Sequence, residues 1–171
     1  MADTPDLGSG TERCEGSTPS VRKVWNPLGV KRVKPDLQFS LLCDEVRRED
    51  NGKLMLIGLF EVIGAPEFPL MYPGMAIVNR WTNGVGEFRQ RIRLVDAENK
   101  VVVETPETVM GLRDMRESIT TVVLLRGVRL PQPGRYSVEI LLDGDLKQRY
   151  ALNVARISLG APPEPGAGPQ G

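Results

Sequence analysis

Residues 41–60 read LLCDEVRREDNGKLMLIGLF, in which Asn51-Gly52 separates two apolar runs. Asn-Gly is the strongest short signal for a β-hairpin, because both residues tolerate the positive φ angles of a type I′ turn. The two runs extend from Leu37 to Val46 and from Lys53 to Ile63. This stretch therefore predicts two antiparallel strands joined by a type I′ turn.

Alternation of apolar and polar residues continues outward from this hairpin. In the first run one face is apolar and is expected to line the core: Leu37, Phe39, Leu41 and Cys43. Residues 54–63 are apolar on both faces, which predicts a central strand that is at least partly covered on both sides. The same reasoning predicts further strands in six segments: 75–81, 88–94, 101–104, 119–125, 136–142 and 150–154.

About eight strands with no long helical pattern predict an all-β fold, an antiparallel β-sandwich of immunoglobulin-like or related type. The sandwich domain is expected to cover residues 36–157. Residues 64–74 contain three prolines and are expected to form a long connection. Residues 104–117 fit a loop, a short edge strand or one helical turn, and their spacing gives only weak support to the helical turn.

Both ends of the chain have the composition of disordered tails. Residues 1–35 begin with a Gly-, Ser-, Thr- and Pro-rich stretch and end in a basic segment, 22–34, around Trp25. Residues 158–171 are mostly Gly, Pro and Ala. Too few large apolar groups are present to offset the entropy lost on ordering such segments.

Composition excludes several classes of function. The 171 residues carry 22 basic and 22 acidic side chains, so no global field favours nucleic acid or a membrane surface. There is no histidine, which removes Ser-His-acid and Cys-His catalysis and most zinc sites. We expect no catalytic residue, no metal and no cofactor. The acidic residues at the turns do not reproduce the spacing of an EF-hand loop, and turns favour Asp and Asn for backbone reasons alone. Without a signal-peptide pattern or a membrane-span-length apolar stretch, a soluble cytoplasmic protein is expected.

The clearest candidate site is an arginine ladder, Arg89, Arg91 and Arg93, which alternates with Phe88, Ile92 and Leu94. Alternation places the three guanidinium groups on one face of a strand, about 7 Å apart. They can bind carboxylates or phosphates of a partner. Alternatively, acids on neighbouring strands pair with them and the ladder only stabilises the sheet.

Trp25 and the basic segment around it form the second candidate partner-binding site. A basic segment with an aromatic anchor suits an acidic partner, a membrane surface or nucleic acid. A solubilising linker, or a segment that adds a strand to its own domain, explains the same residues.

The hairpin strands 41–47 and 52–60 also carry a resemblance. Cys-Asp-acid-Val-Arg followed by Gly-Lys-x-x-Leu-Ile-Gly resembles an uncharacterised family of small bacterial β-sandwich proteins. The resemblance continues more loosely through Gly134-Arg135-Tyr136 and extends over most of residues 36–157. It implies the fold but no activity and no functional residues.

These observations favour a non-catalytic binding or accessory module that acts through protein–protein interaction. A sandwich that binds a glycan or another small polar ligand is the alternative, and a carboxylate-dependent hydrolase is a third. The position of Trp81 discriminates between the first two. An open groove shared by Trp81 and the arginine ladder favours a ligand, and a flat exposed face favours a protein partner. The identity of the partner and the oligomeric state stay open.

Overall fold

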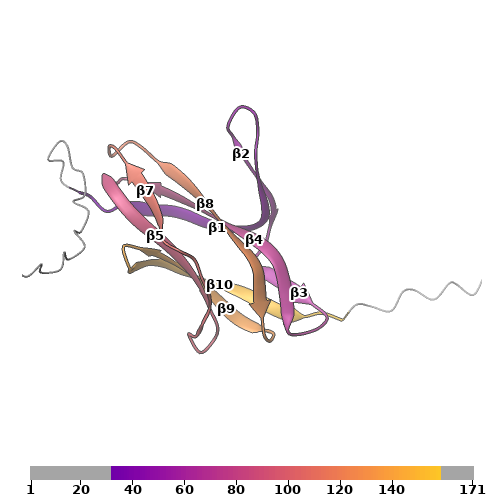
Figure 1. Ribbon diagram of the computed structural model, residues 1–171. Helices are drawn as coiled ribbons and strands as arrows, with labels where there is room; N and C mark the ends of the chain where they lie inside the picture. Colours follow the sequence, from indigo (N-terminus) through magenta and orange to yellow (C-terminus); the bar gives the residue numbers. More distant parts are fainter. Residues whose placement is uncertain (1–31, 159–171) are drawn as a thin grey trace, which may run out of the picture.

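The computed structural model describes residues 32–158 and contains ten β-strands (Figure 1). Their bounds are β1 Asp36–Arg48, β2 Leu54–Leu59, β3 Val62–Ala65, β4 Leu70–Thr82, β5 Gly86–Val95, β6 Val101–Glu104, β7 Thr108–Leu112, β8 Ile119–Leu130, β9 Gly134–Leu142 and β10 Asp145–Arg156. No helix occurs within residues 32–158, so none there can span a membrane. The predicted all-β class is confirmed, with ten strands rather than about eight.

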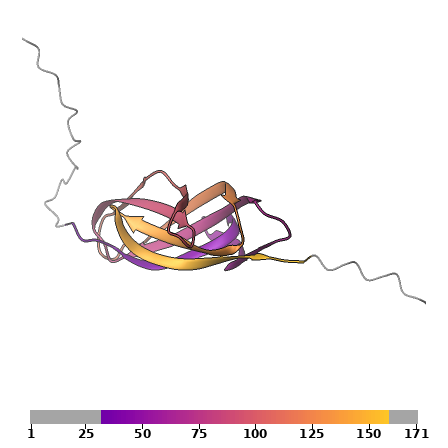
Figure 2. The ribbon, with the colours of Figure 1, turned by 90° about the horizontal axis from the view of Figure 1, so that it is seen from below.

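The strands form two sheets that pack face to face (Figure 2). One sheet has four strands in the order β2-β1-β4-β8. The other has six, in the order β3-β10-β9-β5-β6 with β7 also paired to β5. All pairings are antiparallel except that between β3 and β10.

The core lies between the sheets and follows from the two-residue period of the strands. Ile77 and Trp81 of β4 face Ile140 of β9 and Ile92 of β5 in one buried cluster, and each is at most 1% exposed. Burial of these alternate apolar side chains is the main force that holds the layers together.

The phase of β1 changes at a β-bulge between Leu37 and Phe39. An extra residue in a strand turns every later side chain to the opposite face. Leu37 and Leu42 therefore contact the main core, whereas Phe39 and Cys43 lie in a second small cluster on the outer face, with Ala76. Cys43 is fully buried, but the predicted facing of Phe39, Leu41 and Cys43 toward the core is wrong.

The hairpin at Asn51-Gly52 exists, but its turn is not type I′. Of these two residues only Gly52 has a positive φ, and the Gly52 amide donates to the Glu49 carbonyl at 2.9 Å. This is a three-residue loop that ends in a glycine bulge. The I′ geometry occurs instead at Asp143-Gly144, where φ is 50° and 86°.

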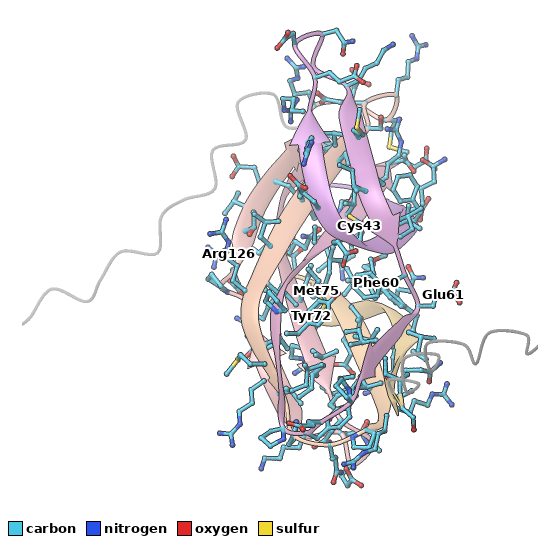
Figure 3. The ribbon with its side chains drawn as sticks, turned by 90° about the vertical axis from the view of Figure 1, so that its right-hand side faces the viewer. Cys43, Phe60, Glu61, Tyr72, Met75 and Arg126 are labelled. Atoms are coloured by element: carbon cyan, nitrogen blue, oxygen red, sulfur yellow. The ribbon has the colours of Figure 1, made fainter. Side chains whose placement is uncertain are left out.

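The predicted central strand 54–63 is wrong, because the chain changes sheet within it. β2 lies at the edge of the four-stranded sheet and β3 at the edge of the six-stranded sheet, with Phe60 and Glu61 between them (Figure 3). The expected long connection 64–74 is also wrong, since β3 reaches Ala65 and β4 begins at Leu70. Of the three alternatives for residues 104–117, the structure has the short edge strand, β7.

Among the described residues, contacts with the sandwich are already made by residue 32, four residues before the expected boundary at 36. Val33 and Val85 exchange two backbone hydrogen bonds of 2.9 and 3.0 Å. Arg32 pairs with Asp143, and Lys34 pairs with Asp145. The remainder of the two expected tails, 1–31 and 159–171, lies outside the described residues.

Tyr136 anchors the start of β9 to the loop that precedes it. Its buried hydroxyl donates a 2.8 Å hydrogen bond to the Gln132 carbonyl, four residues upstream. A tyrosine in this arrangement is a feature of immunoglobulin-like sandwiches, where it fixes the corner between sheets.

We predict that Tyr136→Phe lowers the free energy of unfolding by about 1 kcal/mol, because the Gln132 carbonyl loses its partner. Urea denaturation measures the change. Tyr72→Phe is the matched control, since the Tyr72 hydroxyl bonds to Asp44 at an exposed position and a smaller loss is expected. Equal losses in both variants would contradict a special role for the Tyr136 corner.

Candidate functional site

The arginine ladder lies on the outer face of the six-stranded sheet. Phe88, Ile92 and Leu94 point inward from the same strand and are each 1% exposed. The prediction that alternation separates the arginines from the core is confirmed.

The first two ladder arginines pair with acids beside the edge strands. Arg89 lies 3.4 Å from Glu107, while Arg91 lies 3.0 Å from Glu104 and 2.8 Å from Glu107. These side chains are well exposed to solvent, with 68% of Arg89 and 40% of Arg91 accessible. Exposed pairs of this kind contribute about 0–1 kcal/mol each.

The third ladder arginine is part of a more buried arrangement. Arg93 and Arg149 flank the carboxylate of Glu139, which is only 3% exposed, and the Arg93–Glu139 distance is 2.8 Å. Burial raises the pKa of Glu139, but the hydrogen bonds and charges of Arg149 and Arg93 outweigh it, so the net pKa lies below its ordinary value. One carboxylate thus holds two guanidinium groups on neighbouring strands.

Each ladder arginine therefore has a carboxylate partner within its own chain. Such pairing was expected if the ladder serves only to stabilise the sheet. Binding of a partner through the ladder stays a prediction. Trp25 lies outside the described residues. Trp81 does not share a groove with the ladder, because it is fully buried and donates a 2.6 Å hydrogen bond to Gln90 in the core.

A different site lies along one side of the sandwich, where β1 and β10 run beside each other (Figure 2). β2 pairs with β1 only from Cys43 to Arg48. β3 pairs with β10 only from Asn153 to Arg156. Consequently, no strand within residues 32–158 pairs with this side of β1 before Cys43 or of β10 before Asn153. We call the space between these two unpaired edges the open-edge groove.

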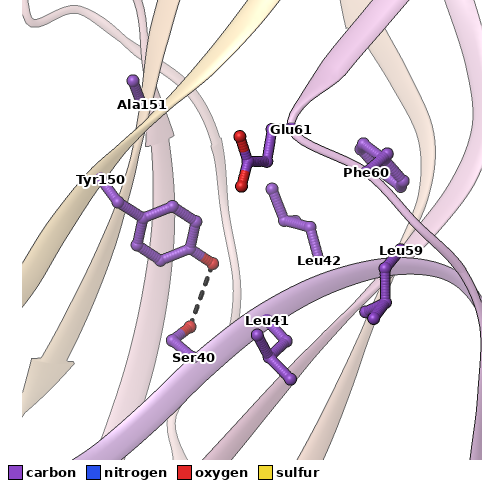
Figure 4. Close-up of a pocket in the computed structure, with 8 residues that line it drawn as sticks. All are labelled: Ser40, Leu41, Leu42, Leu59, Phe60, Glu61, Tyr150 and Ala151. Atoms are coloured by element: carbon purple, nitrogen blue, oxygen red, sulfur yellow. Dashed lines mark hydrogen bonds between the residues drawn. The ribbon is translucent and has the colours of Figure 1, made fainter.

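Two hollows lie in this groove. The larger, about 500 Å³, is lined by Ser40, Leu41, Leu42, Leu59, Phe60, Glu61, Tyr150 and Ala151 (Figure 4). The smaller, about 370 Å³, is lined by Pro35, Asp36, Leu37, Gln38, Lys147 and Gln148. The larger hollow falls within the range of about 300–1,000 Å³ typical of ligand sites.

A hydrogen bond between the two sheets lies within the larger hollow. The Ser40 and Tyr150 hydroxyl groups are 3.0 Å apart (Figure 4). Burial raises the pKa of Tyr150, and the bond to Ser40 lowers it by less, so the phenol stays protonated at neutral pH. Glu61 lines the same hollow at the crossing between the sheets. The site thus offers hydroxyl groups, one carboxylate and backbone groups that no described strand pairs with, beside apolar side chains.

No pattern in the sequence indicated this groove. Ser40, Tyr150 and Glu61 are far apart along the chain, and each is ordinary for a strand or loop. The groove results from which strand edges remain unpaired, and that depends on the change of sheet after β2. The one available signal was Gly58 inside an apolar run, which predicts an irregularity in a strand. Gly58 has a φ of 67° and lies beneath the Asp44 side chain.

Comparison with known proteins identifies a family without a known role. The family model described as "Family of unknown function (DUF6941)" matches residues 38–155. The match spans nearly the whole sandwich, and the expected resemblance to an uncharacterised family is confirmed. No curated protein matches this chain.

We predict that Glu139→Gln lowers the free energy of unfolding at pH 7 by about 1.5–3 kcal/mol, because two guanidinium groups lose their shared charged acceptor. The folded-state pKa of Glu139 is depressed. The contribution of ionised Glu139 to the free energy of unfolding is therefore complete above the ordinary carboxyl pKa. It is lost as the pH falls through the pKa of Glu139 in the folded state. Urea denaturation at pH 7 and pH 3 should show the difference from the parent protein shrinking in acid.

Glu107→Gln is the control for this prediction. The Glu107 side chain is 35% exposed, so we expect a loss of at most about 1 kcal/mol at pH 7. A Glu139→Gln loss that is small, or that does not change between pH 7 and pH 3, would refute the shared-acceptor account.

Proposed function

We propose that this chain, which belongs to the DUF6941 family of unknown function, is a non-catalytic binding module that takes up an extended segment of a partner protein. The segment adds as a strand to the unpaired edge of β10. The observation that carries the proposal is the open-edge groove itself, in which backbone groups with no strand partner among residues 32–158 lie next to two hollows. Strand addition of this kind takes affinity from main-chain hydrogen bonds and specificity from pockets for alternate side chains.

The edge of β10 already accepts one strand. The Asn153 amide donates to the Glu61 carbonyl at 3.1 Å, where β3 begins to pair with β10. Because backbone groups alternate between the two sides of a strand, the peptide groups of Ala151 and Arg149 point to the same edge as those of Asn153. A guest strand would therefore continue the line of β3 and pair with these two residues.

The hollows match the side-chain period of such a guest. One lies beside Lys147 and Gln148 and the other beside Tyr150 and Ala151, about 7–10 Å further along β10. Side chains two residues apart in an extended strand are separated by about 7 Å. Two alternate side chains of the guest can thus enter the two hollows while its backbone pairs with β10.

The glycan alternative has less support. Sites for sugars present exposed aromatic rings, and Trp81, the candidate for that role, is fully buried. The absence of histidine from the sequence favours binding over catalysis. Location in the cytoplasm stays a prediction from composition.

We predict that a random nine-residue peptide library displayed on phage yields binders whose affinity Ala151→Pro lowers at least tenfold. Proline removes the Ala151 amide from the open edge but leaves the bonds to β9 intact, because those come from its neighbours. Ala151→Ser, which keeps the amide, is the matched control and should bind within twofold of the parent protein. Calorimetry of synthetic peptides measures both affinities.

Peptides methylated at alternate backbone nitrogens test the same bonds without changing the protein. One methylation phase should abolish binding, because the methyl groups point at β10, and the other phase should be tolerated. Peptides that bind Ala151→Pro as tightly as Ala151→Ser and tolerate both methylation phases would refute strand addition.

A further inference from the structure

A row of polar side chains crosses the inner face of the four-stranded sheet. Ser40 on β1 lies opposite Asn79 on β4, and Asn79 lies opposite Thr121 on β8. The row starts at the larger hollow of the open-edge groove, which Ser40 lines, and leads into the core.

Both ends of this row are hydrogen-bonded to the opposite sheet. Ser40 bonds to Tyr150, and Thr121 donates to the Gln90 side-chain carbonyl at 2.9 Å. The same carbonyl accepts the Trp81 indole N–H at 2.6 Å. The ends of the row thus link the two layers of the sandwich.

The middle of the row is different. Asn79 is fully buried, and neither its Nδ2 nor its Oδ1 has a hydrogen-bond partner among the described residues. A buried amide without partners destabilises the folded state, and an apolar residue of similar size would avoid that cost. A buried polar side chain without a hydrogen-bond partner needs an explanation, because most such groups in folded proteins are paired. One explanation is that the side chain takes part in binding.

We infer that Asn79 selects the guest strand by pairing with a side-chain carboxamide, above all that of glutamine. This inference rests on the proposed strand addition at β10. Asn79 presents a donor atom, Nδ2, and an acceptor atom, Oδ1, without partners among the described residues, and a carboxamide supplies the complementary acceptor and donor together.

Position supports glutamine as the guest residue. A side chain that enters the larger hollow meets Ser40 and Tyr150 first, and Asn79 lies on the next strand, about 5 Å further in. Asn79 does not itself line the hollow and is fully buried, so selection by Asn79 requires that the Ser40–Tyr150 bond opens and lets a long carboxamide reach inward. Both hydroxyl groups then remain available to the guest backbone or to the same carboxamide.

Selection of the nine-residue phage library on the parent protein and on Asn79→Leu tests the inference. Peptides selected on the parent protein should carry glutamine at one inward position. Those selected on Asn79→Leu should carry leucine or methionine there instead. Asn79→Leu should also unfold at a higher urea concentration than the parent protein, because it buries no unpaired amide. Thr121→Val, at the far end of the row, is the matched control and should keep the glutamine preference.

A substitution in the peptide provides a measurement that does not depend on the variant folding. Replacing the selected glutamine by leucine should weaken binding to the parent protein about tenfold, as expected for the loss of one to two hydrogen bonds. Binders that are sensitive to Ala151→Pro but show no glutamine preference on the parent protein would overturn the role of Asn79 and leave strand addition intact. Failure to select any Ala151-sensitive binder would overturn both.

Discussion

The change of sheet after β2 is the constraint on which the candidate site depends. The chain leaves the edge of β1 after Phe60, whose amide donates to the Leu42 carbonyl, and reaches the edge of β10 at Glu61, so that each edge is paired along only part of its length. Gly58, with its positive φ, turns the chain beneath Asp44, whose carboxylate accepts a 2.8 Å hydrogen bond from Tyr72. A continuous strand over residues 54–63, paired throughout with β1, would have covered more of the β1 edge and left β10 without β3.

The sequence patterns predicted those structural features that depend only on residues adjacent along the chain. The alternation of Phe88, Ile92 and Leu94 with the arginine ladder was found as expected, because side-chain direction in a strand follows from local geometry. The bulge after Leu37 and the split of residues 54–63 were missed. Both depend on which strand lies alongside, and an apolar run alone does not carry that information.

The two candidate sites, the arginine ladder and the open-edge groove, differ in whether their polar groups already have partners in the same chain. The ladder was visible in the sequence, yet its arginines pair with Glu104, Glu107 and Glu139 of the same chain. The groove was invisible in the sequence, yet its strand edges have unpaired backbone groups within the described residues. Because the arginines of the ladder pair with acids of the same chain, a structural role is favoured for the ladder. The unpaired backbone groups of the described strand edges support a binding role for the groove.

Amide hydrogen exchange along β10 in the full-length chain tests the central claim most directly. Tyr150 and Leu152 donate toward β9 and should exchange slowly, whereas the amides of Arg149 and Ala151 face the open edge and should exchange fast. A selected nine-residue peptide should slow exchange at Arg149 and Ala151 alone. If these two amides are already protected in the free chain, another segment of the protein occupies the edge. That result, or no added protection with the peptide, would contradict strand addition by a partner.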